Sequence, residues 1–114
     1  MSDCIFCKIA AGEIPSKKIY EDDKVLAFHD IAPEAPVHFL VIPKEHIDSV
    51  NEINEKNSEV IAHIFMTINK IVKELNIAGS GYRVITNCGK DGGQTVSHLH
   101  FHIMAGRELT WPAG

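Results

Sequence analysis

The sequence lacks long apolar runs, an excess of basic residues and an export signal, and each absence excludes a class of protein. No apolar stretch approaches the roughly 18 residues that a membrane-spanning helix needs, and the first residues resemble neither a secretory nor a transit signal. We therefore expect a cytoplasmic protein that does not enter a membrane. With 15 acidic and 11 basic side chains, the net charge of -4 disfavours a nucleic-acid polymer as a partner, but it does not exclude a single nucleotide.

Cysteine is also scarce, and the 3 cysteines present argue against a disulfide framework. Cys4 and Cys7 have the spacing of a pair that can bind a metal or remain as free thiols. Redox use would favour a strand before the pair, and no strand pattern precedes it. Cys88 has no partner in the sequence, and we expect it to be only a small residue beside a glycine-rich loop.

The remaining composition is that of an ordinary globular protein. Of 114 residues, 45% are hydrophobic and 23% are charged, and no internal repeat or low-complexity segment interrupts them. The sequence therefore predicts a single domain that spans residues 1–114.

The most informative stretch is 96–104, in which three histidines alternate with apolar residues. This period is typical of a strand, whose successive side chains point to opposite faces. Three of the residues on one face are His98, His100 and His102. The other face carries the apolar set Leu99, Phe101 and Ile103. The structural alternative is a polar strand face without chemistry, although neighbouring imidazoles repel one another when charged.

Before this stretch the pattern predicts four strands and two helices, with the long helix between the third and fourth strands. A short helix is expected over 4–11, a hairpin over 19–21 and 25–29 around a charged loop, and a proline-rich loop over 31–36. A strand follows over 38–42, one helical turn over 48–53, a long helix from Ser58 as N-cap to about Leu75, and a strand over 82–87. The long helix has an apolar stripe for the core, and His63 lies outside it as a surface residue without a role. The fold class is therefore α+β, with an antiparallel sheet that helix covers on one face.

Several motifs then resemble one family. The segment His98–Met104 fits the pattern His-φ-His-φ-His-φ-φ, where φ is apolar, and so resembles the histidine triad (HIT) superfamily. Four further segments resemble the Hint branch of purine nucleoside phosphoramidases in order and spacing: Phe28–Pro33, His38–Lys44, Asp91–Gln94 and Gly106–Pro112. The resemblance covers nearly the whole chain. It implies the HIT-like fold, with about five strands, a long helix and a short N-terminal helix, and a homodimer.

The resemblance also implies a hydrolase that cleaves a bond at the α-phosphorus of a purine nucleotide, such as an adenosine 5'-monophosphoramidate. His100 takes the position of the nucleophile, which forms a covalent nucleotidyl intermediate. His102 would donate to a phosphate oxygen, and His38 matches a fourth active-site histidine. The resemblance leaves two roles open for His98: it belongs to this catalytic set, or it binds a metal ion.

Residues for the substrate follow from the same resemblance. Asp30 fits an acceptor for the ribose hydroxyls, and Asn87 fits a contact on the phosphate side. Apolar walls for the base are expected from Phe6, Phe28 and Ile31, with Ile9 and Ile14 left open between pocket and core. Gly93 and Gln94 would donate to phosphate oxygens. Thr95 stands where the Hint family commonly has serine, which puts its contact with the leaving group in doubt.

Relatives with a Cys-x-x-Cys pair also imply a structural zinc ion. Its ligands would be Cys4, Cys7, His46 and His98, because the family places the last ligand two residues before the nucleophile. No organic cofactor is implied. Two other functions remain open: dinucleoside polyphosphate hydrolysis, as in the Fhit branch, and a nucleotide-binding scaffold without useful turnover. The ending Trp111-Pro112 favours the Hint branch. The sequence does not decide between adenosine and guanosine, and it does not identify the leaving amine or protein partners.

Overall fold

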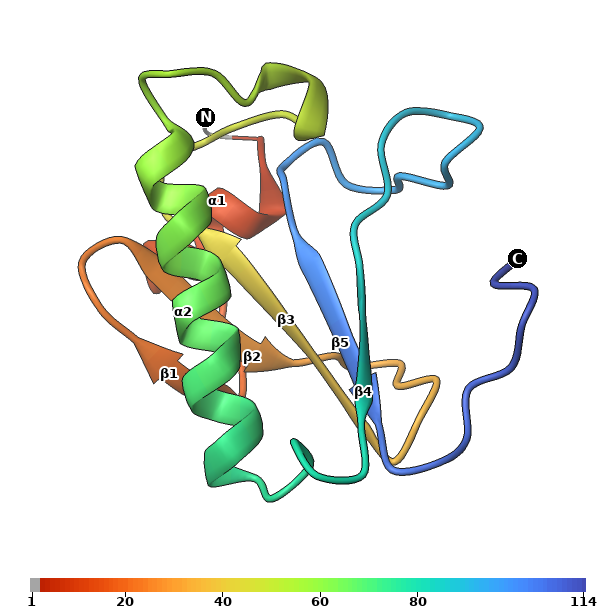
Figure 1. The fold of residues 1–114 in the computed structure, drawn as a ribbon. Coiled ribbons are helices and arrows are strands. Elements are labelled where there is room, and N and C mark those ends of the chain that lie inside the picture. Colours follow the sequence, from red (N-terminus) through yellow and green to blue (C-terminus); the bar gives the residue numbers. More distant parts are fainter. Residues whose placement is uncertain (1–2) are drawn as a thin grey trace.

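The computed structural model describes residues 3–114, and it shows a five-stranded antiparallel sheet with a helix on each face (Figure 1). The predicted α+β class is therefore confirmed, but the prediction that only one face of the sheet is covered is wrong. In chain order the elements are α1 (Ile5–Ala10), β1 (Lys18–Glu21), β2 (Val25–His29), β3 (Val37–Pro43), the 3-10 turn η1 (Val50–Glu52), α2 (Ser58–Glu74), β4 (Tyr82–Ile85) and β5 (Phe101–Ala105). None of the helices described is long and apolar enough to cross a membrane.

The strands lie in the order β1-β2-β3-β5-β4, so β5 enters the sheet between β3 and β4. β1 and β2 form the predicted hairpin, and β3 pairs with β2 on one side and with β5 on the other. His38 lies opposite Met104, and Leu40 lies opposite His102. This register places His38 and His102 diagonally on one face of the sheet, close enough for their rings to meet.

The two faces of the sheet carry separate apolar cores. On one face, α2 packs against β2, β3 and β5 through side chains that include Ile64, Ile68, Phe39 and Phe101. On the other face, α1 contributes Phe6 and Ile9, which pack with Leu26, Phe28, Leu40 and Ile42. The even and odd positions of β2 and β3 divide between these two cores, as the period of a strand requires.

The strand that carries the histidines is shorter than the predicted 96–104. Only Phe101–Ala105 joins the ladder, because the preceding backbone is held by other partners. The N–H of Leu99 donates to the carbonyl oxygen of Ile47 at 2.6 Å, and the Thr86 hydroxyl donates to that of His100 at 2.8 Å. The predicted alternation nevertheless holds, since Leu99, Phe101 and Ile103 all lie in the core under α2.

The ends of α2 also differ from the prediction. The N-cap is Asn57, and Ser58 is the first helical residue. Asn57 uses its side-chain oxygen to accept from the N–H of Asn54 instead of capping the helix. At the other end Asn76 adopts a left-handed φ of 60°, and the next N–H, of Ile77, donates back to Val72. Asn76 therefore ends the helix before the glycines of 79–81.

Two further predictions need correction. β4 ends at Ile85, so Asn87 lies in the loop that follows. His63 has a structural partner, because its Nε2 lies 2.6 Å from Oδ2 of Asp22 in the β1–β2 turn. A surface position on a helix wheel does not show which loop covers it, so the sequence missed this contact.

Candidate active site and metal cluster

His100 is held by a backbone carbonyl in the orientation that a nucleophile needs. Its Nδ1 lies 2.7 Å from the carbonyl oxygen of His98, and because a carbonyl only accepts, Nδ1 carries the proton. In the neutral ring Nε2 therefore keeps a free lone pair. The ring is buried, with Phe6 packed edge-on at 5.0 Å between ring centres and His102 at 5.1 Å. These contacts fix the plane of the imidazole.

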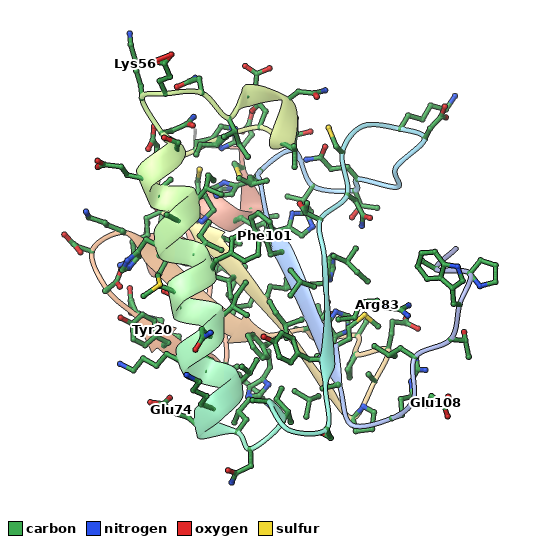
Figure 2. All side chains as sticks on the ribbon, in the orientation of Figure 1. Tyr20, Lys56, Glu74, Arg83, Phe101 and Glu108 are labelled. Carbon is green, nitrogen blue, oxygen red and sulfur yellow. The ribbon has the colours of Figure 1, made fainter. Side chains whose placement is uncertain are left out.

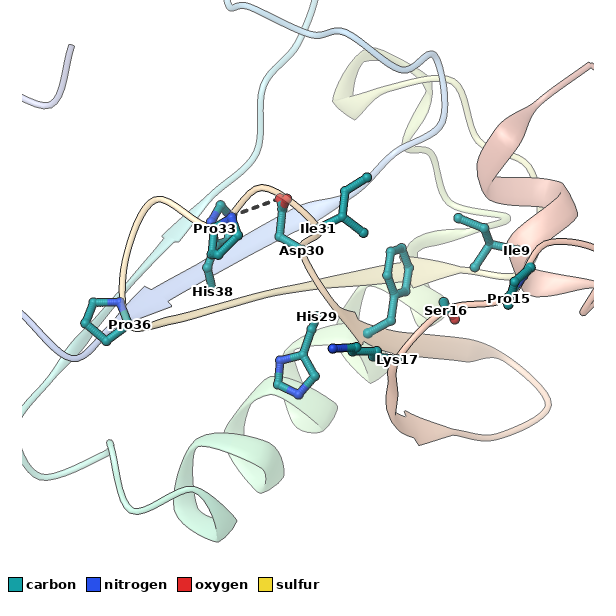
Figure 3. A pocket seen from close by; sticks show the side chains of 11 residues that line it. Ile9, Pro15, Ser16, Lys17, His29, Asp30, Ile31, Pro33, Pro36 and His38 are labelled. Atoms are coloured by element: carbon teal, nitrogen blue, oxygen red, sulfur yellow. Dashed lines mark ion pairs between the residues drawn. The ribbon is translucent and has the colours of Figure 1, made fainter.

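A second chain of contacts fixes the protons of His38 and His102. The N–H of Glu34 donates to Nδ1 of His38 at 3.0 Å, so a neutral His38 carries its proton on Nε2. That Nε2 lies 2.9 Å from Nδ1 of His102 and 3.4 Å from Oδ2 of Asp30. His38 therefore donates to His102, which leaves the His102 proton on its own Nε2. Figure 3 shows the Asp30–His38 contact as a dashed line.

The electrostatic surroundings of His102 favour its uncharged ring. Burial and the neighbouring rings of His100 and His38 lower the pKa of His102 to about 4, and Asp30 opposes this shift. At neutral pH His102 is therefore a neutral Nε2–H donor. His102 can thus offer a hydrogen bond without adding a positive charge beside the neighbouring imidazoles.

The predicted metal ligands Cys4, Cys7, His46 and His98 come together from three separate segments. Their ligand atoms all lie within 4.8 Å of one another. Nδ1 of His98 lies 3.3 Å from Sγ of Cys4, and Nδ1 of His46 lies 3.2 Å from Sγ of Cys7. The short helix α1 supplies this geometry, because Cys4 is its N-cap and Cys7 lies in its first turn.

The outer nitrogens of the two histidines show that the cluster fits a metal ion. Nε2 of His98 lies 2.8 Å from the carbonyl oxygen of Pro43, and Nε2 of His46 lies 2.7 Å from a carboxylate oxygen of Asp48. Both acceptors place the ring proton on Nε2 and leave Nδ1 free to bind a cation among the sulfurs. Asp30, His38 and His102 also lie close together. However, Nε2 of His38 carries a proton and therefore cannot bind a cation there.

Ionisation of the cluster is coupled to metal binding, because a thiol must lose its proton and an imidazole must be neutral to act as a ligand. Burial raises the pKa of the Cys7 thiol, and the adjacent Cys4 raises it further. Burial lowers the pKa of His98, so that its ring stays neutral as a ligand must be. His98 is fully buried, and both of its nitrogens face groups of this cluster or the backbone. His98 therefore has no nitrogen directed at the ring of His100.

A cavity of about 800 Å³ opens beside Asp30 and His38 (Figure 3). Of the predicted pocket residues, Phe28, Asp30 and Ile31 line it, and Ile9 lines it as well. Phe6 and Ile14 pack in the core under α1 instead. Sequence reasoning missed further lining residues, because a proline-rich loop shows no periodicity that would mark its inner side: Pro15, Ser16, Lys17, His29, Pro33 and Pro36.

The donors of the glycine-rich loop, which we predicted to contact phosphate, have hydrogen-bond partners within the protein in this structure. The N–H of Gly93 donates to Lys90 at 3.1 Å, and Nε2 of Gln94 donates to the carbonyl oxygens of Asp48 and Val96. These donors therefore hold the loop in shape. Thr95 is exposed and lines a separate cavity of about 460 Å³ beside the cysteine cluster, and Asn87 is half-buried in the loop after β4.

Comparison with known proteins agrees with the class that the fold and the alternating histidines define. Residues 3–110 match the family described as scavenger mRNA decapping enzyme C-term binding. The structure of a histidine triad protein from Clostridium difficile is 58% identical, with a TM-score of 0.94 and 96% of each chain covered. That of a HIT family hydrolase from Legionella pneumophila is 46% identical, with a TM-score of 0.96, and covers 98% of this chain and 100% of the other.

A eukaryotic structure, the histidine triad nucleotide-binding protein from Candida albicans, is 36% identical with a TM-score of 0.82, over 98% of this chain and 85% of that one. The similarity therefore extends over nearly the whole length of the fold. The chain belongs to the histidine triad (HIT) family.

Proposed function

We propose that the protein is a Hint-type purine nucleoside phosphoramidase, a hydrolase that releases an amine and a nucleoside 5'-monophosphate. The observation that carries the proposal is the free Nε2 of buried His100, oriented by the carbonyl of His98 at 2.7 Å. The cavity of about 800 Å³ has the size of a small-ligand site and begins at Asp30 and His38. The related proteins described as a hydrolase and as nucleotide-binding support the same class.

In the proposed reaction Nε2 of His100 attacks the α-phosphorus, and the bond from phosphorus to the amine nitrogen breaks. The departing nitrogen takes a proton from water. Water then attacks the phosphorus of the nucleotidyl-histidine, and His100 and the nucleoside monophosphate are released. His102 donates from Nε2 to a phosphoryl oxygen in both steps, and His38 fixes that donor. Asp30 accepts from the ribose hydroxyls.

We assign Cys4, Cys7, His46 and His98 to a structural Zn²⁺ ion, and His98 then leaves the catalytic set. Two thiolates and two neutral imidazoles are a preferred ligand set for tetrahedral zinc. The ion would supply folding energy, since it would tie the start of α1 to the segment before β5. The side chains of this cluster carry no step of the reaction.

The proposed function is tested with two variants and with a panel of substrates that contains phosphoramidates and a diadenosine polyphosphate. His100→Ala should lower kcat by several orders of magnitude and leave nucleotide affinity nearly unchanged, because the contacts of the cavity remain. Replacing His102 by alanine should cost roughly 10² to 10³ in kcat, as for one lost donor to the transition state. Rapid-mix mass spectrometry of the wild type should find a nucleotidyl adduct on the peptide that contains His100.

The panel also separates the alternatives. A diadenosine polyphosphate as the preferred substrate would assign the protein to dinucleoside polyphosphate hydrolysis. Binding of nucleotide without turnover of any member would favour the scaffold. An adduct on another residue, or near-normal turnover by His100→Ala, would end the proposed mechanism.

A further inference from the structure

Arg107 lies outside the proposed catalytic residues, yet it holds the loop that sets the proton position of His38. Its Nε and Nη2 donate to the carbonyl oxygen of Glu34 at 3.3 and 2.9 Å, and its Nη1 donates to that of Glu108 at 3.2 Å. A planar guanidinium that joins two backbone segments in this way fixes their relative position better than a single point charge does.

Glu34 connects Arg107 to His38, because its carbonyl oxygen and its N–H both form hydrogen bonds. Its carbonyl oxygen accepts from Arg107, and its N–H donates to Nδ1 of His38 at 3.0 Å. The two flanking prolines, Pro33 and Pro36, donate no backbone hydrogen bonds that could hold the loop in place. The position of the Glu34 N–H therefore depends on contacts with the C-terminal segment.

The residue before Arg107 adds a second constraint at the same place. Gly106 has a φ of 95°, and a Cβ there would lie 2.8 Å from Cβ of Pro36. Only glycine permits both this backbone conformation and this close approach. The turn after β5 is thus shaped to bring Arg107 against the loop that carries Glu34.

We propose that Arg107 is a positioning residue for His102, and that it acts through Glu34 and His38. With the Glu34 N–H in place, the His38 proton stays on Nε2 and is donated to Nδ1 of His102. Without that N–H, His38 also populates the tautomer protonated at Nδ1, and its Nε2 then faces Nδ1 of His102 as a second acceptor. His102 would have to reverse its own tautomer and would lose its outward Nε2–H donor.

The test measures tautomers directly, so it does not require an active enzyme. In protein labelled with ¹⁵N-histidine, long-range ¹H–¹⁵N correlation should show His38 with an unprotonated Nδ1 and a protonated Nε2. In Arg107→Met the two ¹⁵N shifts should move toward each other, and Arg107→Lys should recover part of the difference. Arg107 is exposed, so we expect both variants to fold. Wild-type shifts for His38 in Arg107→Met would overturn the proposal.

Arg83→Met is the matched control. Arg83 donates to the carbonyl oxygens of Thr110 at 2.9 Å and Leu109 at 3.4 Å, so it holds the same C-terminal segment without touching Glu34 (Figure 2 labels Arg83 and Glu108). Its His38 shifts should equal those of the wild type. Equal shift changes in Arg83→Met and Arg107→Met would show an effect of the tail alone and would contradict the proposal.

A second readout rests on the proposed function. With a phosphoramidate substrate, Arg107→Met should lower kcat roughly tenfold, as outer-shell contacts commonly do, with a smaller change in KM. A loss of kcat without the tautomer change would overturn the role of Arg107. A wild type that turns over no phosphoramidate would overturn the proposed function, while the tautomer measurement would still decide the role of Arg107.

Discussion

At the scale of single residues, the backbone determines what each histidine can do. The carbonyl of His98 places the proton of His100 on Nδ1, and the carbonyl of Pro43 places the proton of His98 on Nε2. The Glu34 N–H has the opposite effect on His38, because it requires an unprotonated Nδ1. Three chemically identical side chains thus differ in which ring nitrogen carries the proton, and this difference underlies the roles proposed for them.

A close backbone approach in the glycine-rich loop leads to a prediction at this scale. A Cβ at Gly92 would lie 2.4 Å from the carbonyl oxygen of Cys88 and 2.9 Å from its nitrogen, and neither backbone atom can move away alone. We expect Gly92→Ala to lower the free energy of unfolding by about 1–3 kcal/mol in thermal or urea unfolding. Gly79→Ala is the control, since a Cβ there meets nothing within 4 Å. Equal stability of the two variants would contradict the prediction.

At the scale of elements, Asp22 joins the β1–β2 hairpin to α2. Its carboxylate accepts from the N–H groups of Lys24 and Val25, from the Tyr20 hydroxyl and from His63 on the helix. Burial alone would raise the pKa of Asp22, but these hydrogen bonds hold it well below its usual range. The folded state therefore favours the charged carboxylate, and the hairpin is stabilised most strongly when Asp22 is ionised.

This network predicts a pH-dependent effect of Asp22→Asn. At neutral pH we expect a loss of about 2–3 kcal/mol in the free energy of unfolding, as for hydrogen bonds to a charged group. Because the folded pKa lies below the unfolded one, this contribution is complete above about pH 5 and is lost as the pH falls through the folded pKa. Denaturant unfolding at several pH values should show the wild type and Asp22→Asn converging in acid. A constant difference down to pH 2 would refute this.

We expect the short helix α1 to depend on the proposed zinc site. It has only 6 residues, too few to be stable without tertiary contacts, and Cys4 and Cys7 lie at its start. Elemental analysis of untagged protein should find one zinc ion per chain. Chelation, or Cys4→Ser with Cys7→Ser, should lower the melting temperature and loosen the segment that precedes β5. Cys88→Ser should keep both the zinc and the melting temperature. Zinc-free wild-type protein would contradict the assignment.

At the scale of the whole molecule, the C-terminal tail leaves a large aromatic side chain uncovered. Trp111 is 81% exposed, although the preceding residues of the tail are held by Arg83. We expect this exposed tryptophan on an anchored tail to bind a partner, and the family resemblance implies that the partner is a second copy of the chain. The tail would then reach the site of the partner subunit.

The dimer is tested in two steps. Sedimentation at micromolar concentration should show a homodimer, and a variant that lacks residues 108–114 should change its preference among phosphoramidate substrates. The matched control is Trp111→Ala, which should reproduce most of the change because it keeps the tail but removes its exposed ring. A monomer in solution, or an unchanged substrate preference after the deletion, would refute the expected role of the tail.

The sequence by itself determined the parts of this protein that follow from local periodicity. The alternation after Val96 divided Leu99 from His100 correctly, and the apolar stripe of 60–75 predicted the helix over the sheet. The Cys4 and Cys7 pair, together with the family resemblance, predicted the four-residue cluster that the structure brings together. These features depend on residues a few positions apart or on a shared motif, so a linear reading can find them.

Only the tertiary structure decided what each site residue does, because the deciding partner is distant in the chain or belongs to the backbone. Nδ1 of His98 is free to face the cysteines because the carbonyl of Pro43, 55 positions away, accepts the proton on Nε2. Asp22 and His63 meet across 41 positions, and Arg107 reaches Glu34 across 73. Backbone carbonyls and N–H groups are the same in every residue, so no sequence pattern shows which of them a side chain will meet. Only the packing of the sheet, the loops and the tail brings these groups within hydrogen-bond distance.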